Sequence, residues 1–304
     1  MPLVGCVPLL CALALAAGAP HVARRAPPRP GSATLVVVAL AVALAADVAL
    51  GVLAGARLLD LAPLAALLHW RAERPGPIPV PVPVSIAAAL ALAFVAVAAW
   101  VDWRRSREPM RWLRSLRGNA SAGELIVVRS SELLAHAIPA HGKAPGRILV
   151  SDSMLRALDG DERRVLLEHE RSHLRHRHDR YRDVSRIAAR INPLLRPTIA
   201  ATDFLLERWA DEDAAQTVGS RRLAARALAR AALANVPRPE EHRLAGFAAH
   251  RVSSRVSALM VAAPAKGRHL PLLVSATLAV IAALAAVLAA HDLAHLFDLL
   301  RGDG

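Results

Sequence analysis

Aromatic residues are scarce in this sequence, at 3% of 304 residues, while 55% of the residues are hydrophobic. Alanine, leucine and valine supply most of that apolar content, a composition typical of packed or membrane-spanning helices and not of a β-sandwich. Cysteine is also rare. Cys6 and Cys11 both lie in the first apolar segment, which excludes a disulfide framework in a soluble domain.

Lysine is nearly absent as well, because only Lys143 and Lys266 occur and arginine carries almost all of the net charge of +13. A basic balance can indicate a nucleic-acid partner. Here the arginines are not interleaved with aromatic residues, and no nucleic-acid-binding motif is recognisable. The arginine clusters instead flank apolar stretches, where membrane topology explains them. No direct contact with nucleic acid is therefore expected.

Four apolar stretches are long enough to cross a bilayer, which takes about 20 helical residues. They cover residues 3–19, 33–59, 84–101 and 270–290. We therefore expect a mainly α-helical integral membrane protein with about four transmembrane helices and the lipid bilayer as a partner. Residues 1–101 would form a membrane domain, 102–268 a domain outside the bilayer, and 269–304 the fourth span with a short tail. Asp47 is the one acidic residue well inside a span, and such residues are candidates for function or for helix pairing.

Arginine counts predict the orientation of these spans. The most basic flank follows the third span, over residues 102–117, and the loop over residues 21–30 is basic too. The loop over residues 71–83 carries little charge. The positive-inside rule then places residues 102–268 in the cytosol and both termini outside. The bias toward arginine and alanine is typical of a GC-rich bacterial genome, so the expected location is a bacterial plasma membrane with several passes.

The cytosolic segment predicts a small α+β domain. Strands are expected over residues 124–129 and 147–150, a helix over 130–137, and an edge segment over 137–142. Asp159 and Glu162 are spaced as a capping box that opens a long helix. The pair Asn192–Pro193 ends this helix or its continuation. Further helices are expected over residues 197–218, 221–234 and 247–261.

The sequence His169-Glu170-Arg171-Ser172-His173 lies on the helix that the capping box opens. Residues four apart share one face of a helix, so His169 and His173 can bind one zinc ion. Glu170 would lie beside the metal, where a carboxylate can accept a proton from water. The spacing therefore predicts a zinc peptidase site with Glu170 as the catalytic base.

A catalytic zinc site usually has three protein ligands. Glu207, on a later predicted helix, is our candidate for the third, and Asp211, one turn further, could hold a ligating histidine by its free N–H. The alternative is a compact site that uses His176, His178 or Asp179. A compact site needs a sharp break in the helix, which normally takes a glycine, and residues 161–218 contain none.

Together these stretches resemble the membrane zinc peptidases related to the BlaR/MecR antibiotic-sensor transducers, within the broader gluzincin group. The matching segments are residues 147–151, Leu158 with 161–162, 169–173, 192–194 and 207–211. The resemblance implies a zincin-like domain between the third and fourth spans, with His169, His173 and Glu207 as ligands. The transducers carry a penicillin-binding sensor domain after their last span. These 304 residues have no counterpart to it, so we expect the protease part alone.

The function expected from this reasoning is zinc-dependent cleavage of a protein substrate on the cytosolic side of the membrane, in regulatory signalling. The resemblance suggests a substrate such as a DNA-binding transcriptional repressor, or the protease itself. The alternative is a membrane signalling or scaffold protein that keeps a structural zinc site and does not cleave proteins.

Overall fold

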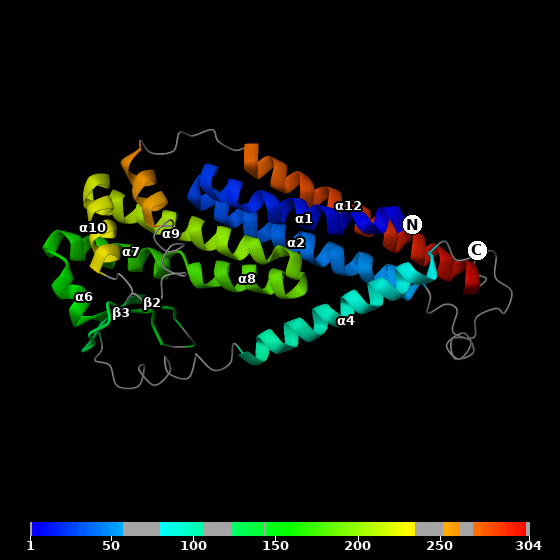
Figure 1. The fold of residues 1–304 in the computed structure, drawn as a ribbon, viewed down its shortest axis with the longest axis horizontal. Coiled ribbons are helices and arrows are strands. Elements are labelled where there is room, and N and C mark those ends of the chain that lie inside the picture. Colours follow the sequence, from blue (N-terminus) through cyan, green and yellow to red (C-terminus); the bar gives the residue numbers. More distant parts are fainter. Residues whose placement is uncertain are drawn as a thin grey trace.

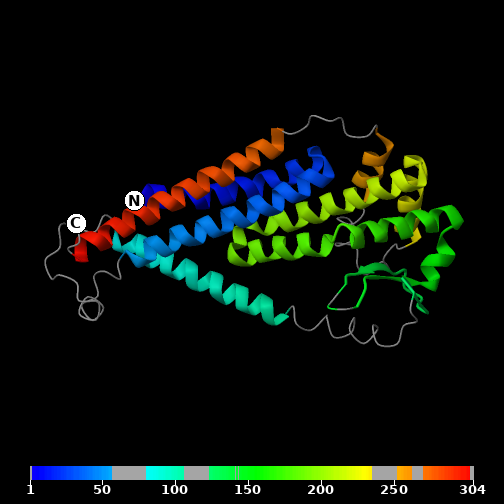
Figure 2. The same ribbon diagram turned by 180° about the vertical axis from the view of Figure 1, so that it is seen from behind.

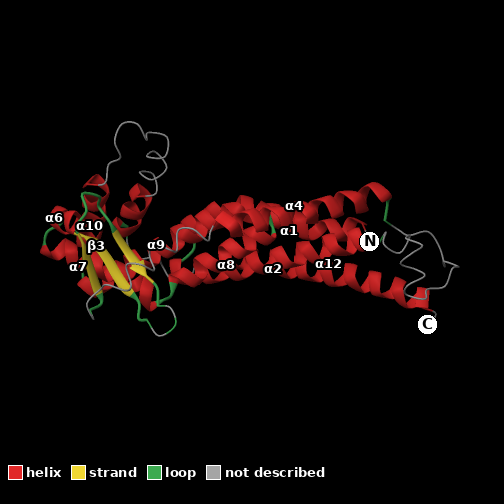
Figure 3. Cartoon of the chain, turned by 90° about the horizontal axis from the view of Figure 1, so that it is seen from below, coloured by secondary structure: helices red, strands yellow, loops and turns green. Residues whose placement is uncertain are grey.

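The computed structural model describes residues 2–56, 80–105, 123–140, 142, 144–234, 252–261 and 270–301. The described chain is elongated and mainly helical, with a small sheet at one end (Figures 1 and 3). Four long helices run along the bundle: α1 (Pro2–Arg25), α2 (Pro28–Gly55), α4 (Val82–Arg105) and α12 (Leu270–Arg301). They are built from the four apolar stretches of the sequence.

These four helices are long and apolar enough to cross a membrane, over Val4–Arg25, Pro28–Gly55, Val82–Val101 and Leu270–Asp292. The predicted spans coincide with them, although residues 57–59 of the second lie outside the described residues. Asp47 is in α2, and its Oδ1 atom is buried without a hydrogen-bond partner in the described part of the chain.

The ends of the four long helices lie at the two opposite ends of the bundle. The α1–α2 turn, the end of α4 and the start of α12 all lie toward the end of the molecule that carries the sheet (Figures 1 and 2). Both termini lie at the opposite end. The sheet is therefore at the same end of the bundle as the basic loop over residues 21–30.

The sheet has three strands in the order β1-β3-β2. Strand β1 (Leu125–Val128) pairs in parallel with β3 (Arg147–Ser151), and β2 (Ala135–Ile138) pairs with β3 in antiparallel orientation. The helix predicted over residues 130–137 is therefore wrong. Residues 135–137 lie in the ladder, where Ile138 is buried opposite Arg147, and pairing with β3 outweighs the weak local preference of an alanine-rich segment for helix.

The remaining helices are α6 (Asp152–Ala157), α7 (Gly160–Arg175), α8 (His178–Ile191), α9 (Arg196–Val218) and α10 (Arg221–Ala234), with the short 3-10 helix η2 (Pro193–Leu195) between α8 and α9. Residues 252–260 are also helical. The predicted capping box is confirmed: the Glu162 N–H donates to Asp159 Oδ1 at 2.9 Å, and the Asp159 N–H donates to Glu162 Oε2 at 3.0 Å. The predicted stop at Asn192–Pro193 is confirmed as well.

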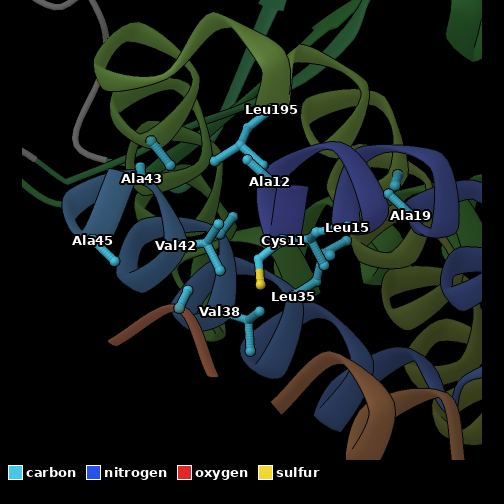
Figure 4. Packing of buried hydrophobic residues seen from close by; sticks show 14 of the residues in the cluster. Cys11, Ala12, Leu15, Ala19, Leu35, Val38, Val42, Ala43, Ala45 and Leu195 are labelled. Carbon is cyan, nitrogen blue, oxygen red and sulfur yellow. The ribbon is translucent and has the colours of Figure 1, made fainter. Parts of the chain in front are cut away.

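The hairpin α8–η2–α9 packs against the membrane helices. Leu195, at its tip, shares one buried cluster with Cys11, Ala12 and Leu15 of α1 (Figure 4). At its base, Arg208 Nη1 donates to the carbonyl oxygens of Ala23 at 2.9 Å and Ala26 at 3.3 Å. The domain boundary at residue 102 stays a prediction, but α8 and α9 share a core with α1 and α2.

Candidate metal centre

Helices α7 and α9 bring three metal-ligand side chains together. The Nε2 atoms of His169 and His173, one turn apart on α7, are separated by 3.2 Å. Glu207 faces them from α9, with Oε2 at 3.4 Å from His169 Nε2 and Oε1 at 3.5 Å from His173 Nε2. These are the three residues that the sequence proposed as ligands, and they form the one cluster of at least three ligand residues in the described chain.

The spacing of the three ligand atoms fits zinc. Ligands at about 2.0–2.1 Å from a tetrahedral ion stand about 3.3–3.4 Å from one another. The two Nε2 atoms are 3.2 Å apart, and each lies 3.4 or 3.5 Å from a different oxygen of Glu207, which is close to this value. Three protein ligands leave a fourth position for water or substrate, which is typical of catalytic zinc sites and not of structural ones.

Asp211 holds the first ligand from behind. Its Oδ1 atom accepts a hydrogen bond from His169 Nδ1 at 3.0 Å, so that the lone pair of Nε2, once this nitrogen is deprotonated, faces the metal position. Burial lowers the pKa of His169, but hydrogen bonds to Asp211 and Glu207 outweigh it and raise the pKa to about 10. Binding of zinc would therefore release a proton from this imidazole.

Arg255 contacts both Asp211 and Glu207 in this site. It was not identified from the sequence. Its guanidinium donates to both oxygens of Asp211 at 2.7 Å and lies 3.1 Å from Glu207 Oε2. Burial raises the pKa of Asp211, but Arg255 first and His169 second hold it below its ordinary value. No motif contains Arg255, and the only sequence signal was its position on the predicted amphipathic helix before the fourth span.

His178 supports the second ligand. Its Nδ1 atom lies 2.7 Å from Nδ1 of His173, and the residue is fully buried. Burial first, and the neighbouring positive charge of His169 second, lower the pKa of His173 to about 2. A neutral His173 that donates from Nδ1 to His178 presents its Nε2 lone pair to the metal, which is the tautomer that ligation needs.

The compact alternative is not the arrangement in the structure. The chain does break after α7, at Arg177, which has left-handed backbone angles (φ 53°, ψ 50°) although it is not glycine. The expectation that a sharp break needs glycine is therefore wrong here. The break turns His178 back onto His173, while His176 Nε2 bonds Asp213 Oδ2 at 2.8 Å. His176, His178 and Asp179 all lie outside the cluster of potential ligands.

Glu170 lies in the wall of a cavity of about 830 Å³ together with His169 and Glu207. Burial raises the pKa of the Glu170 carboxyl, against an opposing effect of His169, and a raised pKa suits a general base. The edge strand β2 contributes His136 to the cavity. Apolar side chains of α7 and α10 form much of the remaining wall, namely Val165, Leu166, Ala224, Ala227, Leu228 and Ala231.

In a comparison with known protein families, the model of Peptidase family M48 matches residues 115–201. No curated protein and no solved structure matches the chain. The matched region contains His169, Glu170 and His173 and ends before Glu207. Over residues 115–201 the chain is thus similar to this metallopeptidase family, whose members are typically zinc-dependent. A specific relation to the BlaR/MecR transducers stays a prediction.

Proposed function

We propose that this protein is a zinc-dependent membrane endopeptidase that cleaves a protein substrate on the cytosolic side. The observation that carries the proposal is the triangle of His169, His173 and Glu207, with Glu170 beside it in an open cavity. The family match covers the α7 part of this site. The four candidate spans support the location in a membrane.

The residues divide the chemistry between them. His169, His173 and Glu207 would hold the ion, which when bound supplies a Lewis acid for the scissile carbonyl and lowers the pKa of water toward 7. Glu170 takes a proton from the attacking water on a carboxylate oxygen and returns it to the leaving amine. Asp211 keeps the proton of His169 on Nδ1, and His178 does the same for His173.

An extended peptide is the form of substrate that the cavity suits. Strand β2 is an edge of the described sheet, and its residue His136 lines the cavity. A substrate strand could add to this edge by backbone hydrogen bonds, which place a peptide without reading its side chains. The substrate would be a cytosolic protein such as a transcriptional repressor, or another copy of the protease itself.

The cytosolic assignment rests on charge. Arg24 and Arg25 end α1, and Arg29 lies in the first turn of α2. The turn between these helices lies toward the end of the molecule that carries the sheet (Figure 2), against which α7, with His169 and His173, packs. Arginine-rich loops are retained in the cytoplasm. A bacterial plasma membrane is the corresponding location.

The test combines metal content with cleavage in the full-length protein in detergent. Wild type should hold one zinc per chain and cleave casein, and Glu170→Gln should keep the zinc but lose cleavage, because an amide cannot accept the proton. Glu168→Gln is the matched control on the same helix and should cleave normally. A wild type that binds zinc without cleaving any protein would favour a structural zinc site and overturn the proposal.

A further inference from the structure

A second cavity, of about 660 Å³, lies behind the metal centre where the α1–α2 turn meets the start of α8. It shares no lining residue with the cavity that contains Glu170, His169 and Glu207. Its wall is basic and aromatic, and contains Arg29, Arg175, Arg177, Arg180, Tyr181 and Trp209.

Acidic side chains of the described segments leave most of the positive charge of this cavity without an ion-pair partner. Among the described residues, Arg29, Arg177 and Arg180 form no ion pair, and Arg175 has only a long contact of 3.8 Å with Glu168. His176, also in the wall, is occupied with Asp213. These arginines are exposed, and exposed guanidinium groups that line one cavity without carboxylate partners are suited to bind phosphate oxygens, often two at a time.

Two further features indicate a built site. The Arg29 guanidinium lies 5.6 Å from the centre of the Trp209 ring, which fixes the position of this cation over a buried aromatic surface. Arg177 occupies the one left-handed backbone position of any non-glycine residue in the described chain. Arg177 lies in the wall of the cavity in this conformation, which glycine adopts at a lower energetic cost.

The location of the cavity identifies the source of the phosphate. Arg29 is in the first turn of α2, where the candidate span Pro28–Gly55 begins, and the preceding span ends at Arg25. The cavity therefore lies at the level where two membrane helices leave the bilayer, which is the level of lipid headgroups. Basic pockets between helices at this interface bind anionic headgroups.

We propose that the cavity bounded by Arg29, Arg177, Arg180 and Trp209 binds the phosphate of an anionic phospholipid headgroup. Trp209 also contacts the ring of His178, with 4.8 Å between centroids, and His178 bonds the ligand His173. A bound headgroup would thus fix the position of Trp209, and through it His178, which bonds the metal ligand His173. The binding itself needs neither metal nor proteolysis.

The experiment titrates the full-length protein in detergent with a soluble short-chain lipid, measured by calorimetry. Dihexanoylphosphatidylglycerol should bind at least tenfold tighter than dihexanoylphosphatidylcholine, and inorganic phosphate should bind much more weakly than either. Arg29→Gln with Arg180→Gln should weaken phosphatidylglycerol binding by roughly 30-fold, at about fivefold for each arginine near a membrane surface. Arg164→Gln with Arg222→Gln removes the same charge from exposed positions outside the cavity and should change binding less than twofold.

Arg177→Gly guards against a folding artefact, because glycine accepts the left-handed backbone while the guanidinium is removed. It should also weaken binding about fivefold. Glu170→Gln should bind lipid like wild type, which separates this result from a failure of the proposed peptidase. Equal affinity for the two lipids, unchanged affinity in the cavity variants, or phosphate binding as tight as the lipid would each overturn the assignment.

Discussion

Arg255 donates two parallel hydrogen bonds to Asp211, from Nε to Oδ2 and from Nη2 to Oδ1, each 2.7 Å long. This pair joins the helix over residues 252–260 to the metal centre formed by α7 and α9. Arg221 fixes the end of the same short helix by donating to the carbonyl oxygens of Ala258 and Leu259. The segment just before the fourth span therefore contributes to the site.

Asp211→Ala should loosen zinc without removing it. The carboxylate orients His169 through Nδ1 and does not reach the metal position, and loss of such a partner typically weakens metal binding by 10–100-fold. Competition with a chromophoric chelator measures the change. Asp213→Ala, which removes a carboxylate bonded to Ser172 and His176, is the control. Identical zinc affinity in wild type and Asp211→Ala would contradict the role given to the Asp211–His169 bond.

Arg255→Ala should destabilise the protein strongly. It leaves the buried carboxylate of Asp211 without its cation, whereas Glu207 keeps its ion pair with Arg182, and removal of one partner from a buried ion pair costs about 3–5 kcal/mol. Arg255→Lys should recover part of this loss, because it keeps the charge but not the paired geometry. Thermal melting in detergent compares both with Arg222→Ala, an exposed arginine whose loss should stay within about 0.5 kcal/mol. A melting temperature of Arg255→Ala equal to that of wild type would show that the pair adds nothing to stability.

Local patterns in the sequence predicted much of this architecture. The four apolar runs predicted α1, α2, α4 and α12, because length and hydropathy alone decide whether a helix can span a bilayer. The Asp159–Glu162 capping box predicted the start of α7, and helical spacing predicted that His169 and His173 would share a face. Glu207 was found from its spacing to Asp211 on one later helix.

Features that depend on contacts between distant segments were missed. Strand β2 owes its conformation to pairing with β3, which no property of residues 130–137 reveals. Arg255 joins the site from 44 residues beyond Asp211, and His178 reaches His173 only because Arg177 accepts a left-handed conformation. The packing of Leu195 against α1 likewise depends on how α8 and α9 turn back as a hairpin.

Glu207→Ala should strip most of the zinc, because it removes one of three ligands. His178→Ala should retain zinc with reduced affinity, since His178 touches His173 and lies outside the ligand cluster. Elemental analysis of the two purified proteins distinguishes the Glu207 site from the compact alternative. One tightly held zinc in Glu207→Ala together with a metal-free His178→Ala would reverse the assignment.

Reporter fusions test the orientation of the spans. Alkaline phosphatase fused after Ala56, at the end of α2, should be active, because the enzyme requires export. The same reporter after Arg105, at the end of α4, should be inactive, since the arginine-rich flank is retained in the cytoplasm. A fluorescent protein that folds only in the cytosol should give the opposite pattern. Phosphatase activity after Arg105 would show that the orientation is reversed and that the metal centre is outside the cytosol.

Glu162 is fully buried, and its carboxylate pairs with two arginines. Its oxygens lie 3.1 Å from Arg226 Nε and 2.8 Å from Arg230 Nη1, and it also accepts the Asp159 N–H in the capping box. Burial raises the pKa of Glu162, but Arg230 and the Asp159 N–H together hold it below the ordinary value of 4.5. A carboxylate with a lowered pKa in the folded state stabilises the fold above its unfolded pKa, and this stability is lost as the pH falls below about 4.5.

Two substitutions at this position separate the cap from the charge. Glu162→Ala should lower the stability of the protein at pH 7 by about 1–2 kcal/mol, because it removes the reciprocal cap and the ion pairs together. Glu162→Gln should lose less, since glutamine can also accept the Asp159 N–H. Thermal melting at pH 7 and pH 4 measures both. The gap between wild type and Glu162→Gln should narrow at pH 4, where wild-type Glu162 begins to lose its charge, whereas the gap between Glu162→Gln and Glu162→Ala should persist. A gap between wild type and Glu162→Gln that widens as the pH falls would show that the charge of Glu162 opposes folding.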